Sequence, residues 1–211
     1  MEKTPKGFKV GIMGGTFDPV HYGHLVTAEA ARAEYNLQQV IFVPTGRPPH
    51  KEKIEISNAE DRLLMTTLAT LTNPYFDVSR ADIDRPGLTY TIDTIEDLRR
   101  VYGPDATLYF ITGADALLEI LTWKDAARLV DMCQFIAASR PGYSLSLLEK
   151  ALGRFFTEKR QAFHLLEVPA LAISSTDIRE RVRSGRPIQY LLPETVAYYI
   201  IKNRLYTRRS A

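Results

Sequence analysis

The residues best suited to chemistry lie between positions 14 and 25, where the sequence reads GGTFDPVHYGHL. Two of the four histidines of the chain, His21 and His24, stand three residues apart in this stretch, so they would share one face of a helix. The preceding Gly14 and Gly15 would let backbone amides come close to a ligand. Free N–H groups at a helix N-terminus attract anions, and two imidazoles beside them predict a pocket for phosphate.

Two other interpretations of the histidine pair are weaker. A metal site would need further ligands, and no third His, Cys or carboxylate stands at ligand spacing nearby. The pair could instead cap a helix without binding anything, which is the commoner outcome for an isolated H-x-x-H pattern. The flanking glycines and the Asp18-Pro19 turn favour a binding site. Neither the dinucleotide fingerprint G-x-G-x-x-G nor the phosphate-binding loop G-x-x-x-x-G-K-[ST] is present.

A second group of candidate residues is ISSTDIR, residues 173–179. Ser174 or Ser175 is expected to cap a helix whose first amides face phosphates. Arg179 follows about one turn later, and an arginine can span two phosphate oxygens at once. The alternative is an ordinary helix cap with an arginine on the surface.

A third candidate lies in FITGAD, residues 110–115, at the end of an apolar run. Gly113 would permit close approach of a ligand, and Asp115 could accept hydrogen bonds from ribose hydroxyls. Asp115 could also cap the next helix, and the two roles are compatible.

Short apolar runs alternate with amphipathic segments along the chain. The apolar runs predict strands at residues 8–13, 40–44, 75–79, 107–113, 133–139 and 163–168. The amphipathic segments predict helices at residues 24–35, 61–71, 91–102, 123–130, 145–155, 174–185 and 193–206. Ser57 and Glu60 are expected to form a capping box before the second helix, and Gly103 is expected to end the third.

This alternation predicts an α/β fold with a mostly parallel sheet, helices on both faces and right-handed crossovers. No linker divides the chain, so residues 1–211 are expected to form a single domain whose C-terminal helical part begins at about residue 174. Ligands of such sheets bind beyond the carboxyl ends of the strands. This rule predicts that residues 14–24, 113–115 and 169–175 meet on one rim.

The composition is that of an ordinary globular protein, with 45% hydrophobic and 25% charged residues. A net charge of +2 does not favour a nucleic-acid partner. The single cysteine, Cys133, excludes an internal disulfide and a cysteine-rich zinc site, and it is expected to be buried. The N-terminal MEKTPKGFKV lacks the apolar core of a signal peptide, and no apolar run approaches the ~20 residues of a spanning helix. We therefore expect a cytoplasmic protein with no membrane partner.

The segment GGTFDPVHYGHL resembles the [T/H]-x-G-H signature of the nucleotidyltransferase superfamily. Along almost its whole length the chain is similar to bacterial nicotinate-nucleotide adenylyltransferases. The matching segments are, in order, GGTFDPVHYGHL, PPHK (48–51), RPGLTYTIDT (85–94), FITGAD (110–115), Trp123 and ISSTDIR (173–179). The resemblance implies a Rossmann-like nucleotidyltransferase fold. It also implies a reaction of NAD synthesis, in which ATP and nicotinate mononucleotide give nicotinate adenine dinucleotide and pyrophosphate with Mg²⁺.

The resemblance implies three sets of site residues. The catalytic set is His21, His24 and Arg179, with the histidines donating hydrogen bonds to ATP phosphates and the transition state rather than abstracting a proton. The ATP-binding set is Gly14, Gly15, Thr16, Phe17, Lys51, Gly113, Asp115, Ser174, Ser175 and Thr176. The set for the pyridine mononucleotide is Thr89, Tyr90, Trp123 and Lys124. Mg²⁺ would be held mainly by ATP phosphates and water, with no metal ligand from the protein.

Three of these residues carry more specific expectations. Lys51 lies on a proline-restricted loop that would fold over the phosphates. Trp123 would stack on the pyridine ring, although a lone tryptophan is more often part of a core. Thr89 and the helix amides near Thr91 would hold the carboxylate of the ring, and this contact would separate nicotinate from nicotinamide.

Two alternatives to this function stay open. One is an adenylyltransferase that prefers nicotinamide mononucleotide or accepts both mononucleotides. The other is a module that senses nucleotides without turnover, and the intact catalytic set argues against it. A homo-oligomer is also possible, because Tyr198, Tyr199 and Ile200 could join either the core or a contact between subunits.

Overall fold

The computed structural model describes residues 5–49, 56–139, 145–169 and 172–207. Its centre is a sheet of six strands in the order β3-β2-β1-β4-β5-β6, and every neighbouring pair is parallel, as predicted. The strands are β1 (Lys9–Gly15), β2 (Gln39–Pro44), β3 (Phe76–Val78), β4 (Thr107–Gly113), β5 (Gln134–Ser139) and β6 (Phe163–Glu167). The strand order reverses between β1 and β4, and doubly wound folds bind their ligands at such a reversal.

The strands form where the sequence offers short apolar runs, because a parallel sheet covered on both faces buries its strands almost completely. In β2, for example, all residues from 40 to 44 are buried. The fifth strand begins one residue later than predicted, since Cys133 ends the preceding helix and Gln134 opens β5. Cys133 is buried as expected, and this burial raises the pKa of its thiol.

Each predicted helix has a counterpart in the structure, with α7 and α8 together corresponding to residues 145–155. The helices are α1 (Tyr22–Glu34), α2 (Ala59–Thr70), α3 (Ala81–Asp84), α4 (Thr91–Tyr102), α5 (Ala114–Leu117), α6 (Ala126–Met132), α7 (Leu145–Leu152), α8 (Arg154–Glu158), α9 (Ser175–Arg183) and α10 (Glu194–Lys202), and short 3₁₀ helices occupy Ile120–Thr122 and Arg160–Ala162. The short helices α3 and α5 were not predicted from the sequence.

The starts of α1 and α2 differ from the prediction. Helix α1 begins two residues early, because His21 serves as its N-terminal cap. The predicted capping box at Ser57 is wrong: Asn58 caps α2, and its side chain accepts a hydrogen bond from the N–H of Glu60 at 3.0 Å. The backbone N–H of Ser57 instead donates to Asp18 at 3.3 Å, so a distant part of the chain holds this residue.

Helix α6 also begins later than predicted, at Ala126. Asp125, the residue before it, adopts a left-handed backbone with φ of 52°. Trp123 and Lys124 therefore lie in the connection that precedes the helix rather than in its first turn.

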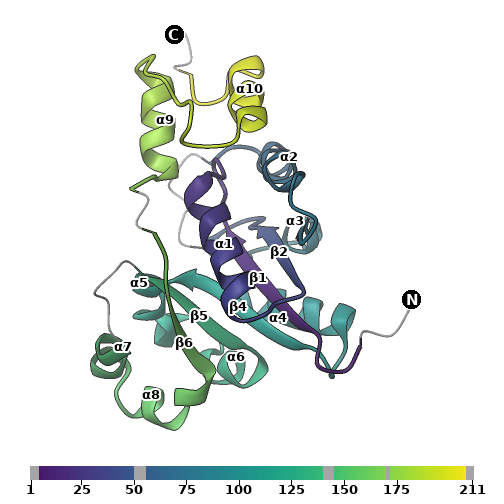
Figure 1. Cartoon of the computed structure of the whole chain (residues 1–211), viewed down its shortest axis with the longest axis vertical. Helices are drawn as coiled ribbons and strands as arrows, with labels where there is room; N and C mark the ends of the chain where they lie inside the picture. Colours follow the sequence, from purple (N-terminus) through teal and green to yellow (C-terminus); the bar gives the residue numbers. More distant parts are fainter. Residues whose placement is uncertain (1–4, 50–55, 140–144, 170–171, 208–211) are drawn as a thin grey trace.

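Helices cover both faces of the sheet (Figure 1). On one face, α4, α6 and α7 share a core with sheet residues such as Ile12, Phe110 and Phe135. On the other face, α1, α2, α9 and α10 share a core with sheet residues such as Val40 and Ile136. The neighbouring β5 residues Phe135 and Ile136 belong to opposite cores, as the alternation of a strand requires.

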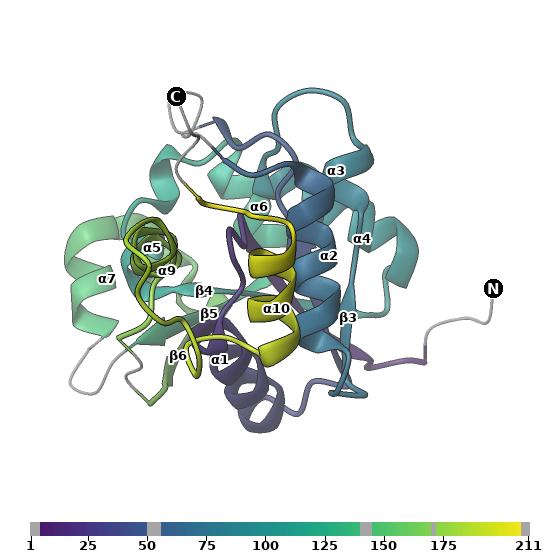
Figure 2. The ribbon, with the colours of Figure 1, turned by 90° about the horizontal axis from the view of Figure 1, so that it is seen from above.

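The C-terminal helices α9 and α10 lie beyond the carboxyl ends of the strands, and α10 runs beside α2 (Figure 2). The hydroxyl of Tyr199 in α10 donates to Asp61 of α2 at 2.7 Å. Ile200 is fully buried, whereas Tyr198 is 65% exposed. The apolar residues of α10 thus divide between the core and the surface, and Ile200 belongs to the core.

Candidate functional site

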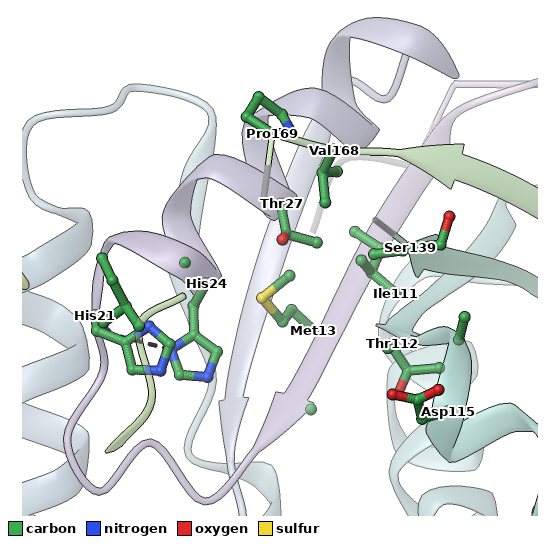
Figure 3. A pocket seen from close by; sticks show the side chains of 16 residues that line it. Met13, His21, His24, Thr27, Ile111, Thr112, Asp115, Ser139, Val168 and Pro169 are labelled. Atoms are coloured by element: carbon green, nitrogen blue, oxygen red, sulfur yellow. Dashed lines mark hydrogen bonds between the residues drawn. The ribbon is translucent and has the colours of Figure 1, made fainter. Parts of the chain in front are cut away.

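A cavity of about 620 Å³ opens at the carboxyl end of the sheet, at the reversal between β1 and β4 (Figure 3). Its wall includes Gly14 from β1 and His21 and His24 from the start of α1. Residues from β4, the start of α5, β5 and the segment after β6 complete the wall, and they include Asp115, Ser139, Pro169 and Ile173. The three stretches predicted to share one rim therefore do line one cavity, whose size is typical of small-molecule sites.

The histidine pair is fixed by the start of α1. The backbone N–H of His21 donates to Nδ1 of His24 at 3.2 Å, and the two ring centroids lie 3.8 Å apart. Gly23 makes this arrangement possible, because a Cβ atom there would stand 3.0 Å from Cε1 and Nδ1 of His21. The histidines thus cap the helix and line the cavity at once, so the two interpretations of the H-x-x-H pattern are not exclusive.

Burial keeps both imidazoles neutral at neutral pH. Only 7% of His21 is exposed, and burial lowers its pKa to about 4. The pKa of His24 is lowered to about 3, first by burial and second by the neighbouring His21. Nδ1 of His21 is buried without a hydrogen-bond partner among the described residues. Such a group is costly to leave unsatisfied, so the site is prepared for a polar ligand.

The loop between β1 and α1 turns sharply under the histidines. Phe17 has a left-handed backbone with φ of 50°, and the Asp18-Pro19 peptide bond is cis. The ring of Phe17 is only 2% exposed and meets the ring of His24 edge to face, with centroids 5.1 Å apart. The side chain of Phe17 therefore supports the ring of His24.

The two glycines at the end of β1 have a packing role beside the predicted one. A Cβ atom on Gly14 would stand 3.2 Å from the ring of Phe110, and one on Gly15 would stand 3.0 Å from the ring of Phe17. Both contacts are tighter than ordinary packing. Gly14 also lines the cavity, so close approach of a ligand and close packing of aromatic rings coincide there.

The segment that opens α9 lies against the same loop. Ser174 is the N-terminal cap of α9, and its side chain accepts from the N–H of Asp177 at 3.1 Å. The hydroxyl of Ser175 donates to the carbonyl of Pro19 at 2.8 Å. Nη1 of Arg179 donates to the carbonyl of Asp18 at 2.7 Å, and its Nη2 donates to the hydroxyl of Thr176 at 3.3 Å. The structure thus brings the second predicted group of residues against the first.

Asp115 and Thr112 lie across the cavity from the histidines (Figure 3). Gly113 caps the short helix α5, and Asp115 is its second residue. The prediction that Asp115 could be a helix cap is therefore wrong. Its carboxylate is exposed and lines the cavity, where it can accept hydrogen bonds from a ligand.

The four residues predicted for the pyridine mononucleotide lie near one another, outside the residues that line the cavity. Nζ of Lys124 lies 4.7 Å from the ring centroid of Tyr90, and Tyr90 caps α4. Thr89 is buried, and its hydroxyl accepts from the backbone N–H of Arg47 at 3.2 Å. Trp123 is half-buried, so it both packs on the core and presents part of its ring to the surface.

Phe110 connects this group to the cavity. Its ring meets that of Trp123 edge to face, with centroids 6.0 Å apart. The same ring would contact a Cβ atom on Gly14, which lines the cavity. One aromatic ring therefore contacts a residue of each predicted binding region, Trp123 and Gly14.

Lys51 falls within residues 50–55, outside the described part of the chain.

Arg62 is a site-organising residue that the sequence analysis missed. It is only 2% exposed, and it donates to the carbonyls of Thr16 at 2.9 Å, Thr45 at 2.6 Å, Gly46 at 3.1 Å and Ser57 at 3.0 Å. It therefore joins the loops that follow β1 and β2 to the start of α2. A signal was present: Arg62 occupies the same face of the helix as the buried Met65 and Ala69.

The described residues offer neither a metal site nor a membrane-spanning helix. No group of three or more His, Cys, Asp or Glu side chains is arranged to hold a metal ion in that part of the chain. None of its helices is both long enough and apolar enough to span a membrane.

Comparisons with known proteins agree on one family. The family model described as cytidylyltransferase-like matches residues 12–181. A probable nicotinate-nucleotide adenylyltransferase of Moorella thermoacetica is 62% identical over 201 residues, which cover 95% of this chain and 93% of the relative. One from a Thermoanaerobacter species is 58% identical over 200 residues, which cover 95% of each chain.

Solved structures share the fold. The structure of a Plasmodium falciparum nicotinic acid mononucleotide adenylyltransferase complexed with NaAD gives a TM-score of 0.76 at 22% identity. The match covers 94% of this chain and 97% of that one. The predicted Rossmann-like nucleotidyltransferase fold is confirmed.

Proposed function

Because the chain belongs to the cytidylyltransferase-like family, and within it to the nicotinate-nucleotide adenylyltransferases, we propose that it performs their reaction. ATP and nicotinate mononucleotide give nicotinate adenine dinucleotide and pyrophosphate, a step of NAD synthesis. The observation that carries this proposal is the pair of buried, neutral imidazoles at the start of α1, which face a cavity at the reversal of the sheet. Such a site suits the phosphates of a nucleotide.

The chemistry requires positioning more than proton transfer. An oxygen of the mononucleotide phosphate attacks the α-phosphorus of ATP, the bond from that phosphorus to the bridging oxygen breaks, and pyrophosphate leaves with the electron pair. A phosphate monoester has a second pKa near ~6, so the nucleophile is already charged at neutral pH. Catalysis then depends on holding two anions in line and stabilising the charge that develops on pyrophosphate.

The histidines suit this task because they are neutral donors. Nδ1 of His24 accepts a hydrogen bond from the backbone, so in the neutral ring the proton sits on Nε2. The Nε2–H group can then donate a hydrogen bond to a phosphate oxygen. Nδ1 of His21 has no partner among the described residues and can form a hydrogen bond with the ligand. Arg179 supplies a permanent charge from α9, beside the carbonyl of Asp18.

The two substrates would occupy opposite sides of Phe110. We place the adenosine by Gly113 and Asp115, whose exposed carboxylate can accept from ribose hydroxyls. We place the pyridine ring against Trp123, with its carboxylate at the amides that open α4 next to Thr89. Mg²⁺ would arrive with ATP, held by phosphate oxygens and water, because this ion dehydrates reluctantly.

One assay tests the proposal. Pyrophosphate release is measured with ATP and Mg²⁺ and with nicotinate mononucleotide, nicotinamide mononucleotide or phosphopantetheine as the acceptor. We expect the fastest release with nicotinate mononucleotide, since a site built for a carboxylate is mismatched to an amide. Equal rates with the two pyridine nucleotides would contradict this selectivity. Binding of nucleotide without release from any acceptor would identify a sensor instead.

A further inference from the structure

The loop that carries the histidines is held mainly by parts of the chain far away in sequence. Asp18 lies in this loop, three residues before His21, and is only 4% exposed. Its carboxylate accepts from the hydroxyl of Tyr206 at 2.7 Å and from the backbone N–H of Ser57 at 3.3 Å. Its carbonyl accepts from Arg179 at 2.7 Å. A short polar residue is thus bound on three sides.

Tyr206 reaches Asp18 from the end of the described chain. It follows α10 in a left-handed conformation with φ of 62°, and the N–H of Leu205 donates to the carbonyl of Ile200 at 3.0 Å just before it. Its hydroxyl also lies 3.9 Å from Sδ of Met65 in α2. Burial and the neighbouring Asp18 both raise the pKa of the Tyr206 phenol. The phenol therefore stays protonated and remains a donor to the carboxylate.

Arg62 contacts the segments that surround Asp18. It donates to the carbonyls of Thr16 and Ser57, which flank Asp18 from two different segments. Burial lowers the pKa of Arg62, and Asp18 opposes that shift by its charge. The buried Asp18 and Arg62 and the half-buried Tyr206 therefore form one polar cluster that joins the β1–α1 loop, the start of α2 and the C-terminal segment. A hydrogen bond in such surroundings is hard to replace, because water does not compensate for its loss.

We propose that Tyr206 is a positioning residue for the reaction, which acts through Asp18 to hold the β1–α1 loop and with it the imidazoles of His21 and His24. This inference rests on the proposed function. Tyr206 is not among the residues that line the cavity, and its hydroxyl contacts Asp18 instead. Its effect is on geometry: the loop begins at the end of β1, and His21 and His24 follow Asp18 by three and six residues.

The test is Tyr206→Phe, which removes one hydroxyl and keeps the ring. We expect kcat to fall about 10-fold while the KM for each substrate changes less than twofold, because a small displacement of donors harms the transition state most. Tyr198→Phe is the matched control: it lies on the same C-terminal segment, is 65% exposed and should keep wild-type kinetics. An unchanged kcat in Tyr206→Phe would overturn the proposal.

A second measurement does not depend on activity. The imidazole resonances of His21 and His24 are recorded by NMR in the substrate-free protein, and we expect them to shift in Tyr206→Phe but not in Tyr198→Phe. Unmoved resonances, even with a lower melting temperature, would overturn the proposal by leaving Tyr206 with a structural role alone. If the wild-type protein releases no pyrophosphate from any acceptor, the proposed function fails, yet the resonances still report whether Tyr206 positions the loop.

Truncations give an independent comparison. A chain ending at Leu205 lacks Tyr206, and a chain ending at Thr207 retains it. We expect the first to lose kcat and to shift both histidine signals, and the second to match the full chain. Equal kcat and equal histidine signals in the two truncations would contradict the role of Tyr206.

Discussion

The backbone N–H of His21 donates to Nδ1 of His24 at 3.2 Å, so the cap of α1 also orients the ring that faces the cavity. Nδ1 of His24 must accept in this bond, and we infer that the neutral ring carries its proton on Nε2. The same hydrogen bond therefore caps the helix and orients the ring that can donate to a ligand. Disturbing either histidine should therefore change the position of the other.

His24→Ala should lower kcat by about 10²–10³, the usual cost of losing one well-placed donor to a developing charge. Circular dichroism should show an intact fold, since α1 is also held by packing of Ala28 and Ala31 in the core. His164→Gln is a suitable control, because that ring lies on β6 and pairs with Gln134 at 3.0 Å. Near-normal turnover in His24→Ala would refute the assignment of this residue.

The strands and the general architecture could be predicted from local sequence because the information is local. Strands of a covered parallel sheet are continuous apolar runs, and these are visible without knowing their neighbours. Helix starts were less predictable. His21 is an unusual cap residue, so the start of α1 carried no familiar signal. For α2, Ser57 and Asn58 are equally good cap residues by type, and Ser57 is bound to Asp18, so Asn58 caps the helix.

The supports of the site could not be predicted because they connect distant positions. Tyr206 and Asp18 are 188 residues apart, and Arg179 and Asp18 are 161 residues apart. Neither pair leaves a periodic pattern in the sequence. His21 and His24, by contrast, are close in sequence as well as partners in the site, so one short motif was enough to predict both.

The imidazoles of the free protein should not titrate in the usual range. Burial lowers the pKa of His21 to about 4, and the pKa of His24 is about 3. NMR titration should therefore show both rings neutral from pH 8 down to pH 5. Bound triphosphate should raise both pKa values, since a nearby anion favours the charged form. Rings that titrate near pH 6.5 in the absence of nucleotide would contradict the burial of the pair.

Stability should fall as the pH is lowered from 6.5 towards 4. The folded-state pKa of His21, about 4, lies below its ordinary value of 6.5, so in this window the unfolded chain binds more protons than the folded protein. The expected loss from His21 alone is on the order of 3 kcal/mol at pH 4. Urea unfolding at pH 7 and pH 4 measures it. His21→Gln should lose less stability than the wild type over the same interval, and equal losses would exclude His21 as the source.

Gly23→Ala should separate activity from stability. The added Cβ would stand 3.0 Å from the ring of His21, so the ring must move. Alanine in place of glycine in a helix usually adds up to ~1 kcal/mol of stability. We therefore expect kcat to fall about 10-fold while the free energy of unfolding is unchanged or higher. A variant with normal kcat would show that the ring of His21 does not need its present place.

Arg62→Met should destabilise the protein strongly. The substitution removes the donor to four carbonyls, those of Thr16, Thr45, Gly46 and Ser57, and the methionine cannot replace it. The carboxylate of Asp18 also loses a nearby positive charge. We expect the free energy of unfolding to fall by about 3–5 kcal/mol, as when one partner of a buried charged pair is removed.

Urea denaturation measures this change, and Arg100→Met provides the matched control. Arg100 is also an arginine on a helix, but its side chain is 72% exposed and its ion pairs lie on the surface, so its removal should change stability by less than about 0.5 kcal/mol. Arg62→Lys keeps the positive charge, but the compact ammonium group has fewer N–H donors than the guanidinium. This variant should therefore recover only part of the lost stability. Full stability in Arg62→Lys would mean that charge alone, and not the four directed hydrogen bonds, holds the loops together.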